Sequence, residues 1–347
     1  MSLPKCDAQR RPPPGPRMTS SAYYPEGVLL EDVPCPHRCP PSDEPVLEGH
    51  DRLNGVPGRF RVVRCRHCGL MRTNPRPTSE TIGVYYPDTY APYQSVATGT
   101  PPVKVRRWHH RVKERIHRFL GHDMRRLPPI EPGHMIEIGC ASGDYLLQMQ
   151  ALGWSTEGIE FSESAAVKAR ASGLQVQQAT VENAEPPMQQ ADVVAAWMVL
   201  EHLHQPVEAL QKVRTWVKPE GYLVGVVPDA DAWDRKIFGP YWYALHLPAH
   251  LFHYTPRSLR RLFAEAGWDL VHLRWQANAN HLLNSLESWL QDQQRPRALK
   301  WVRWLKNDPS RRAHKMRRRL HWLLGVTHQS GRMEFWARPS TQPRTEP

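Results

Sequence analysis

Apolar and polar residues follow two alternating patterns along the chain from about residue 130 onward. Short apolar runs typical of strands cover seven segments, 134–139, 154–160, 174–180, 191–199, 222–229, 268–277 and 331–339. Amphipathic stretches with helical spacing lie between most of them, at 144–153, 162–173, 206–221 and 258–267. Ser162 is a candidate N-cap, and Gly153 and Gly173 are candidate helix stops. This alternation predicts an α/β fold with a doubly wound, mostly parallel sheet of seven strands.

The segment 278–330, before the last predicted strand, has a different composition. Trp and Leu recur at helical intervals among basic residues, which predicts a pair of helices with one apolar and one cationic face. Residues 295–319 hold eleven Lys and Arg but only one acid, Asp308, in a chain whose formal net charge is +12. Such a surface suggests an anionic partner such as phosphate, lipid head groups or nucleic acid; a merely solvated helix face is the alternative.

The N-terminal residues show neither the helical nor the strand periodicity of apolar residues. The proline-rich stretch "RRPPPGPRM" (10–18) predicts a disordered leader over 1–26. No apolar run of the length of a signal peptide follows it, and no stretch of 18 apolar residues occurs. We therefore expect a cytoplasmic protein, with peripheral contact to an anionic membrane through 295–319 as a hypothesis.

Four of the six cysteines form two closely spaced pairs, Cys35 with Cys39 and Cys65 with Cys68. Paired spacing without a secretion signal favours a metal site over disulfides. Four thiolates suit a closed tetrahedral zinc site, which stabilises a small unit without a large core. Three residues separate the first pair, so His37 is an alternative to Cys35 or Cys39 as a ligand.

A glycine-rich turn follows the first predicted strand, in "HMIEIGCASGDYL" (134–146). In a doubly wound sheet such a turn lets a ligand approach the backbone, and the next helix points its N-terminus at that ligand. Glu160 ends the second strand, where a carboxylate can accept hydrogen bonds from ribose hydroxyls. The dinucleotide pattern G-x-G-x-x-G does not fit, because Gly139 and Gly143 are four residues apart and Asp144 follows.

The turn has the form E-x-G-x-A-x-G and resembles the first motif of the class I S-adenosylmethionine-dependent methyltransferases, [D/E]-x-G-x-G-x-G, with Ala141 in place of the middle glycine. Four further stretches resemble later segments of that family in order: "GIEFSESA" (158–165), "ADVVAAWMVLEHLHQPVEAL" (191–210), "VKPEGYLVGVVPD" (217–229) and "LPAHLFHYTPRSLRRLFAEAGW" (247–268). The resemblance spans about 130–277 and implies a Rossmann-like methyltransferase sheet that binds S-adenosylmethionine.

The same resemblance assigns the cofactor-binding residues. Glu137, Gly139, Ala141 and Gly143 would line the methionine end of the cofactor, and Glu160 would hold the ribose. The residues after the third strand, Val181 or Glu182, would lie near the adenine, and Trp197 and Met198 would border the methyl group.

The stretch around the second cysteine pair resembles the N-terminal zinc-ribbon segment found in a branch of these enzymes, with C-x-x-C-G-L at 65–70 and N-P-R-P at 74–77. That branch is often tied to modification of small molecules or saccharides. The expected organisation is a leader (1–26), a zinc-ribbon-like domain (27–80), a helical linker (81–130), the S-adenosylmethionine-binding domain (131–277), a basic helical insertion (278–330), the last strand (331–339) and a tail (340–347).

Candidate bases for the methyl acceptor cluster after the fourth strand and around "HLPAHLFHY" (246–254). Histidine suits this task because its ordinary pKa is near neutral; the foremost candidates are His250, His202 and His253.

No Asp/Asn-Pro-Pro-Tyr-like motif of N-methylating nucleic-acid enzymes follows the fourth strand, so a nucleic-acid substrate is not expected. The expected activity is O-methylation of a small molecule, saccharide or lipid-linked glycan. The alternatives are a quinone-pathway-like O-methyltransferase and a non-catalytic zinc-ribbon module that binds nucleic acid.

Overall fold

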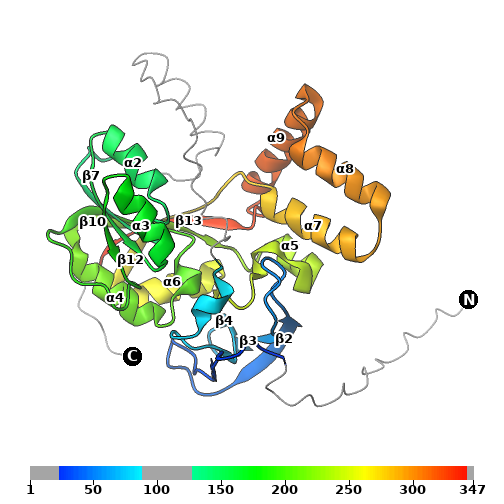
Figure 1. Ribbon diagram of the computed structural model, residues 1–347, viewed down its shortest axis with the longest axis horizontal. Coiled ribbons are helices and arrows are strands. Elements are labelled where there is room, and N and C mark those ends of the chain that lie inside the picture. The colour runs from blue at the N-terminus through cyan, green and yellow to red at the C-terminus, as the bar shows by residue number, and fades with distance from the viewer. Residues whose placement is uncertain (1–22, 88–126, 342–347) are drawn as a thin grey trace, which may run out of the picture.

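A seven-stranded sheet forms the centre of the computed structural model, which describes residues 23–87 and 127–341 (Figure 1). Its strands lie in the order β12-β13-β10-β9-β6-β7-β8. Their bounds are β6 (His134–Ile138), β7 (Ser155–Glu160), β8 (Gln175–Gln178), β9 (Ala191–Trp197), β10 (Val217–Pro228), β12 (Trp268–Trp275) and β13 (Arg332–Pro339). All seven predicted strands are confirmed.

The sheet is parallel except at one strand. The pairs β6–β7, β7–β8, β6–β9 and β9–β10 are parallel, whereas β13 runs antiparallel to both β10 and β12. Because β6 pairs with both β7 and β9, the chain winds outward from β6 in two directions, which opens a crevice at the carboxyl ends of these strands. The predicted doubly wound, Rossmann-like sheet is therefore confirmed.

Helices cover both faces of this sheet because successive strand residues point to opposite sides. Met135 of β6 packs with Tyr145 and Met149 of α2, whereas its neighbour Ile136 belongs to the core cluster that includes Leu210 of α4 and residues of α6. The helices are α2 (Asp144–Ala151), α3 (Glu163–Ala171), α4 (Pro206–Trp216) and α6 (Pro256–Glu265). The predicted N-cap of α3 is present, since the Ser162 side chain accepts a hydrogen bond from the Ala165 amide.

The N-terminal part forms a small module of short strands beside the large sheet (Figure 1, blue). β2 (Asp43–Gly49), β3 (Phe60–Cys65) and β4 (Met71–Thr73) form an antiparallel sheet, and β1 (Leu30–Glu31) pairs with β5 (Arg76–Pro77). The fourth strand of the module's sheet is β11 (Phe252–His253), which pairs with β4 and comes from the C-terminal half of the chain. The module is thus tied to the segment that carries the predicted catalytic histidines.

The insertion before the last strand contains three helices, so the prediction of a helical pair was wrong. They are α7 (Asn280–Asp292), α8 (Pro296–Asn307) and α9 (Arg311–Val326), which lie to one side of the sheet (Figure 1). Pro296 starts α8, and Pro309 precedes the Ser310 N-cap of α9. Proline favours a helix start and disfavours continuation of a preceding helix, so these two residues divide the segment into three.

Shorter elements connect these parts: α5 (Trp233–Phe238) and the 3₁₀ turns η2 (Ile82–Tyr85), η4 (Leu200–His202), η5 (Gly239–Tyr241) and η6 (Tyr243–Leu245). Most of the predicted leader (1–26), linker (81–130) and tail (340–347) lies outside the described residues. Within the described ranges, every helix is too short or too polar to cross a lipid bilayer.

Candidate active site

A cavity of about 720 Å³ opens at the carboxyl ends of β6, β7 and β9. Much of its wall consists of the turn after β6, the ends of β7 and β9, the loop after β8, and the histidine-rich stretch around η6. Tyr86 and Ile82 of the N-terminal module also line it. The crevice expected of a doubly wound sheet is therefore present and is closed on one side by the small module.

The glycine-rich turn has a left-handed backbone at three positions. Gly139, Ala141 and Gly143 have φ angles of 69°, 49° and 86°. Gly143 is the N-cap residue of α2, so the turn leads directly into the helix N-terminus. Ala141 keeps the left-handed conformation that the usual middle glycine would adopt freely, at a cost of roughly 1–2 kcal/mol. The turn thus keeps a left-handed backbone at Ala141 despite the substitution, and Gly139 and Ala141 line the cavity.

Glu160 ends β7 and organises this turn. One carboxylate oxygen accepts a hydrogen bond from the Ala141 amide at 2.8 Å, and the other accepts one from the Ser162 amide at 2.8 Å. Burial raises the pKa of Glu160, while hydrogen bonds from the Ser162, Ala141 and Phe161 amides oppose that rise. Each oxygen has a second lone pair, and Glu160 lines the cavity, so the carboxylate can also accept hydrogen bonds from a ligand.

The other residues predicted to bind the cofactor divide into two groups. Gly139, Ala141, Val181, Glu182, Trp197 and Met198 all line the same cavity as Glu160. Glu137 and Gly143 are not part of its wall; Glu137 is buried within β6 and Gly143 is the N-cap of α2. Their roles in cofactor binding stay predictions.

Three of the histidines that line the same cavity lie next to one another. They are His202, His246 and His250. The ring centroid of His250 lies 4.7 Å from the ring centroid of His202 and 4.6 Å from that of His246. Tyr243 meets His246 edge to face at 5.1 Å. His253, the third predicted base, does not line the cavity; its ring lies 6.0 Å from that of Trp242.

Burial keeps these imidazoles neutral. It lowers the pKa of His202 to about 4 and that of His246 to about 3, and it holds the pKa of His250 well below its ordinary value. Burial also raises the pKa of the neighbouring Glu201 to about 8. At neutral pH the cavity therefore presents uncharged nitrogens that can accept a proton or bind an electrophile.

Sequence reasoning missed several residues of the cavity wall. Tyr243, His281 and Arg332 come from η6, α7 and β13, and the Arg332 guanidinium donates a hydrogen bond to His281 Nε2 at 2.9 Å. No local pattern marks them, because their proximity depends on how the insertion returns to the sheet. Tyr86 follows the N-P-R-P stretch (74–77) of the zinc-ribbon resemblance, and that stretch assigned no role to it.

Comparison with known proteins agrees with this geometry. Residues 106–273 match the model of a methyltransferase-domain family. The chain carries a class I methyltransferase domain. S-adenosylmethionine is the cofactor of this family, and the turn after β6 together with Glu160 matches the family's pattern. No curated protein matches the sequence of this methyltransferase.

Many solved structures are similar to this chain at low sequence identity. An S-adenosylmethionine-dependent methyltransferase from Mesorhizobium loti is 14% identical, with 64% of this chain and 97% of that chain covered and a TM-score of 0.43. A complex of the Haloferax volcanii Trm112 activator with a putative methyltransferase gives 16% identity, 70% and 98% coverage and a TM-score of 0.43. The [4+2]-cyclase SpnF gives 16% identity, 77% and 98% coverage and a TM-score of 0.45.

The methyltransferase also contains the predicted cysteine cluster. The four sulfur atoms lie within 4.8 Å of one another; they belong to Cys35, Cys39, Cys65 and Cys68. The Cys35 and Cys68 sulfurs are 3.5 Å apart. Zinc–sulfur bonds of about 2.3 Å in a tetrahedron separate the sulfurs by about 3.8 Å, so this donor set fits zinc. A hydrogen bond from the Cys35 thiol lowers the pKa of Cys68 to about 4, which favours a thiolate there. His37 is not part of this cluster, and its Nδ1 contacts the Glu265 carboxylate.

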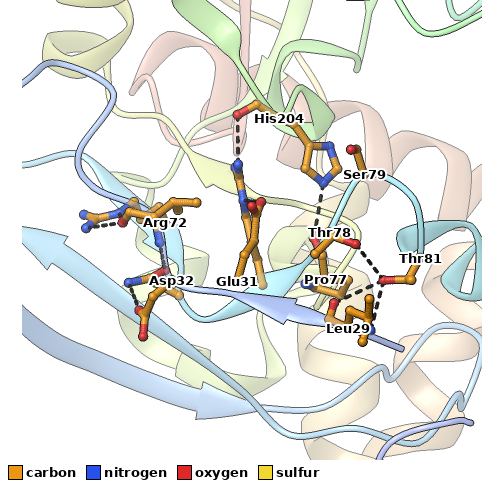
Figure 2. A network of polar contacts seen from close by, with 12 residues as sticks. Leu29, Glu31, Asp32, Arg72, Pro77, Thr78, Ser79, Thr81 and His204 are labelled. Carbon is orange, nitrogen blue, oxygen red and sulfur yellow. Dashed lines mark hydrogen bonds and ion pairs between the residues drawn. The ribbon is translucent and has the colours of Figure 1, made fainter. Parts of the chain in front are cut away.

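The small module positions the loop after β9 through a polar network (Figure 2). The Arg76 guanidinium donates to the Glu31 carboxylate at 2.8 Å and to the His204 carbonyl oxygen at 3.1 Å. The His204 side chain in turn donates from Nε2 to the Pro77 carbonyl at 3.2 Å. The loop that carries His202 and His204 is therefore held by the zinc-ribbon-like module as well as by the sheet.

Proposed function

We propose that this methyltransferase transfers the methyl group of S-adenosylmethionine to a hydroxyl oxygen of a small molecule, saccharide or lipid-linked glycan. The observation that supports it is the cavity itself, in which the glycine turn and Glu160 share one wall with His202 and His250. The cofactor would occupy the side lined by Gly139, Glu160 and Glu182, with the acceptor near the histidines.

The chemistry requires alignment and a place for one proton. The acceptor oxygen attacks the methyl carbon in line with the carbon–sulfur bond, that bond breaks, and S-adenosylhomocysteine leaves. The hydroxyl proton then passes to a base. Neutral imidazoles at His202 and His250 line the cavity, whereas His253 does not, so the first two are the better candidates.

The size of the cavity favours a compact acceptor. Pockets for cofactors and small ligands measure about 300–1,000 Å³, and this cavity of about 720 Å³ falls within that range. The cofactor would occupy much of it, which leaves space for one small ring or a sugar unit. The four-cysteine cluster does not favour the quinone-pathway alternative, in which a zinc ribbon is not expected.

Labelled methyl transfer tests this function. The chain is incubated with methyl-labelled S-adenosylmethionine and an extract of the source cells, and the products are partitioned between organic and aqueous phases. We expect the label on a low-molecular-weight or lipid-linked product, released as methyl iodide by hydriodic acid because it is bound to oxygen. Label that stays non-volatile under conditions that cleave methyl ethers would contradict O-methylation.

We also propose that the basic insertion touches anionic membrane lipids while the acceptor is bound. Trp301 of α8 and Trp322 and Leu323 of α9 are each about half exposed, on helices that carry the exposed basic residues of 295–319. Exposed tryptophans beside cationic side chains suit the interface of an anionic bilayer. Sedimentation should show salt-sensitive binding to phosphatidylglycerol vesicles but not to phosphatidylcholine vesicles; absence of binding at low salt would refute this contact.

A further inference from the structure

Three side chains beside the cavity form a cluster that the proposed function does not explain. Glu201 and His202 belong to η4, directly after β9, and His250 precedes β11. One possible ligand atom from each lies within 4.8 Å of the other two. His202 and His250 line the cavity, so the cluster borders the space expected to hold the acceptor.

The ring orientation of each histidine is fixed by a hydrogen bond at its own Nδ1 atom. His202 Nδ1 lies 2.9 Å from the Ala249 carbonyl oxygen and 2.7 Å from the Tyr86 hydroxyl. His250 Nδ1 lies 2.8 Å from the Ala244 carbonyl oxygen. Donation from Nδ1 to a carbonyl sets the tautomer and leaves the Nε2 lone pair as the available ligand, which is the usual arrangement of metal-binding histidines.

Glu201 is the least expected member of the cluster. Its side chain is completely buried, and no other described residue donates a hydrogen bond to either carboxylate oxygen. The Arg332 guanidinium attracts it electrostatically but is not a hydrogen-bond donor to either oxygen. A buried carboxyl group without hydrogen-bond donors is costly, and such groups are normally paired or coordinate a metal. A metal ion held by Glu201 together with the two oriented imidazoles would explain why a carboxyl group is buried there.

We propose that Glu201, His202 and His250 bind a divalent cation at the acceptor end of the cavity. Two imidazoles and one carboxylate suit a first-row ion such as Mn²⁺, Fe²⁺, Co²⁺ or Zn²⁺ and leave coordination positions open. An acceptor hydroxyl bound at an open position would lose its proton more readily. That role rests on the proposed O-methylation, whereas cation binding itself does not.

His246 complements the cluster. Its ring lies 4.6 Å from that of His250, it lines the cavity, and neither ring nitrogen has a hydrogen-bond partner among the described residues. With His202 and His250 engaged by the cation, His246 would still be able to accept the hydroxyl proton.

Titration with Mn²⁺, followed by the loss of its free-ion electron paramagnetic resonance signal, tests the site in the full chain without cofactor or acceptor. Mn²⁺ prefers oxygen and nitrogen donors, so the four-cysteine cluster does not compete for it. We expect one Mn²⁺ per chain. Glu201→Gln or His250→Gln should weaken its binding by about 100-fold or more, because even the loss of a residue that only orients a ligand costs about 10–100-fold. His253→Gln is the matched control, since His253 is equally buried but lies outside the cluster.

The outcomes separate this proposal from the methyl-transfer proposal. Loss of Mn²⁺ binding in both cluster variants, but not in His253→Gln, supports the site even if no methyl acceptor has been found. Failure of the folded wild-type chain to bind Mn²⁺ at millimolar concentration would overturn it. Equal binding by wild type and both cluster variants, with native circular dichroism spectra, would overturn it as well.

Discussion

Replacing Glu160 with alanine is expected to lower the affinity of the methyltransferase for S-adenosylmethionine by about 100-fold or more. Hydrogen bonds to a charged group contribute about 1.5–3 kcal/mol each, and the carboxylate would accept two from the ribose. The same side chain also holds the Ala141 and Ser162 amides at 2.8 Å, so its removal loosens the turn that surrounds the cofactor. Titration calorimetry with S-adenosylmethionine measures the change.

Two further variants show whether the effect belongs to this carboxylate. Glu163→Ala removes an exposed carboxylate three residues away and should leave the affinity unchanged. Glu160→Gln retains an acceptor oxygen for one backbone amide and should fall between wild type and Glu160→Ala. Equal affinities for wild type and Glu160→Ala would contradict the placement of the ribose on Glu160.

Loss of the cysteine cluster is expected to have the largest effect on stability. Structural zinc contributes about 10–16 kcal/mol in small zinc domains, which is comparable to the whole stability of many proteins, about 5–15 kcal/mol. Cys65→Ser or Cys68→Ser should therefore abolish bound zinc and lower the thermal unfolding temperature strongly. Because β4 pairs with β11, just after His250, the disturbance should also reach the cavity.

Zinc content by mass spectrometry and thermal unfolding by circular dichroism check this result. Cys140→Ala is the matched control, since Cys140 is a buried free cysteine outside the cluster. It should retain one zinc per chain. A wild-type chain that is isolated without zinc, and unfolds at the same temperature as Cys65→Ser, would refute a structural zinc site.

Local sequence patterns were sufficient for the central sheet, because strand and helix periods repeat over whole elements. They were not sufficient for β11, a strand of two residues whose pairing with β4 depends on a contact across the chain. They also merged the helices of the insertion, where the two breaks depend on single prolines at 296 and 309. Short elements and breaks of this kind leave little periodic signal.

The candidate site followed the same rule. Glu160, Gly139 and Trp197 could be placed because each occupies a fixed position at the end of a recognisable strand. His202 and His250 were both predicted as candidate bases, but the contact between their rings could not be foreseen. It depends on packing between distant parts of the chain, such as the hydrogen bond that joins His202 to the Ala249 carbonyl. Glu201 drew no attention as a metal ligand because its burial, and its lack of donors, are visible only in the fold.

The most direct test of the account is a crystal structure of the full chain with S-adenosylhomocysteine. The central claim is that one cavity holds both the cofactor and the acceptor. We predict that the ribose hydroxyls will bind the Glu160 carboxylate and that the cofactor sulfur will face His202 and His250. Density for the cofactor away from Glu160, or a cavity that stays without it at saturating concentration, would contradict the account.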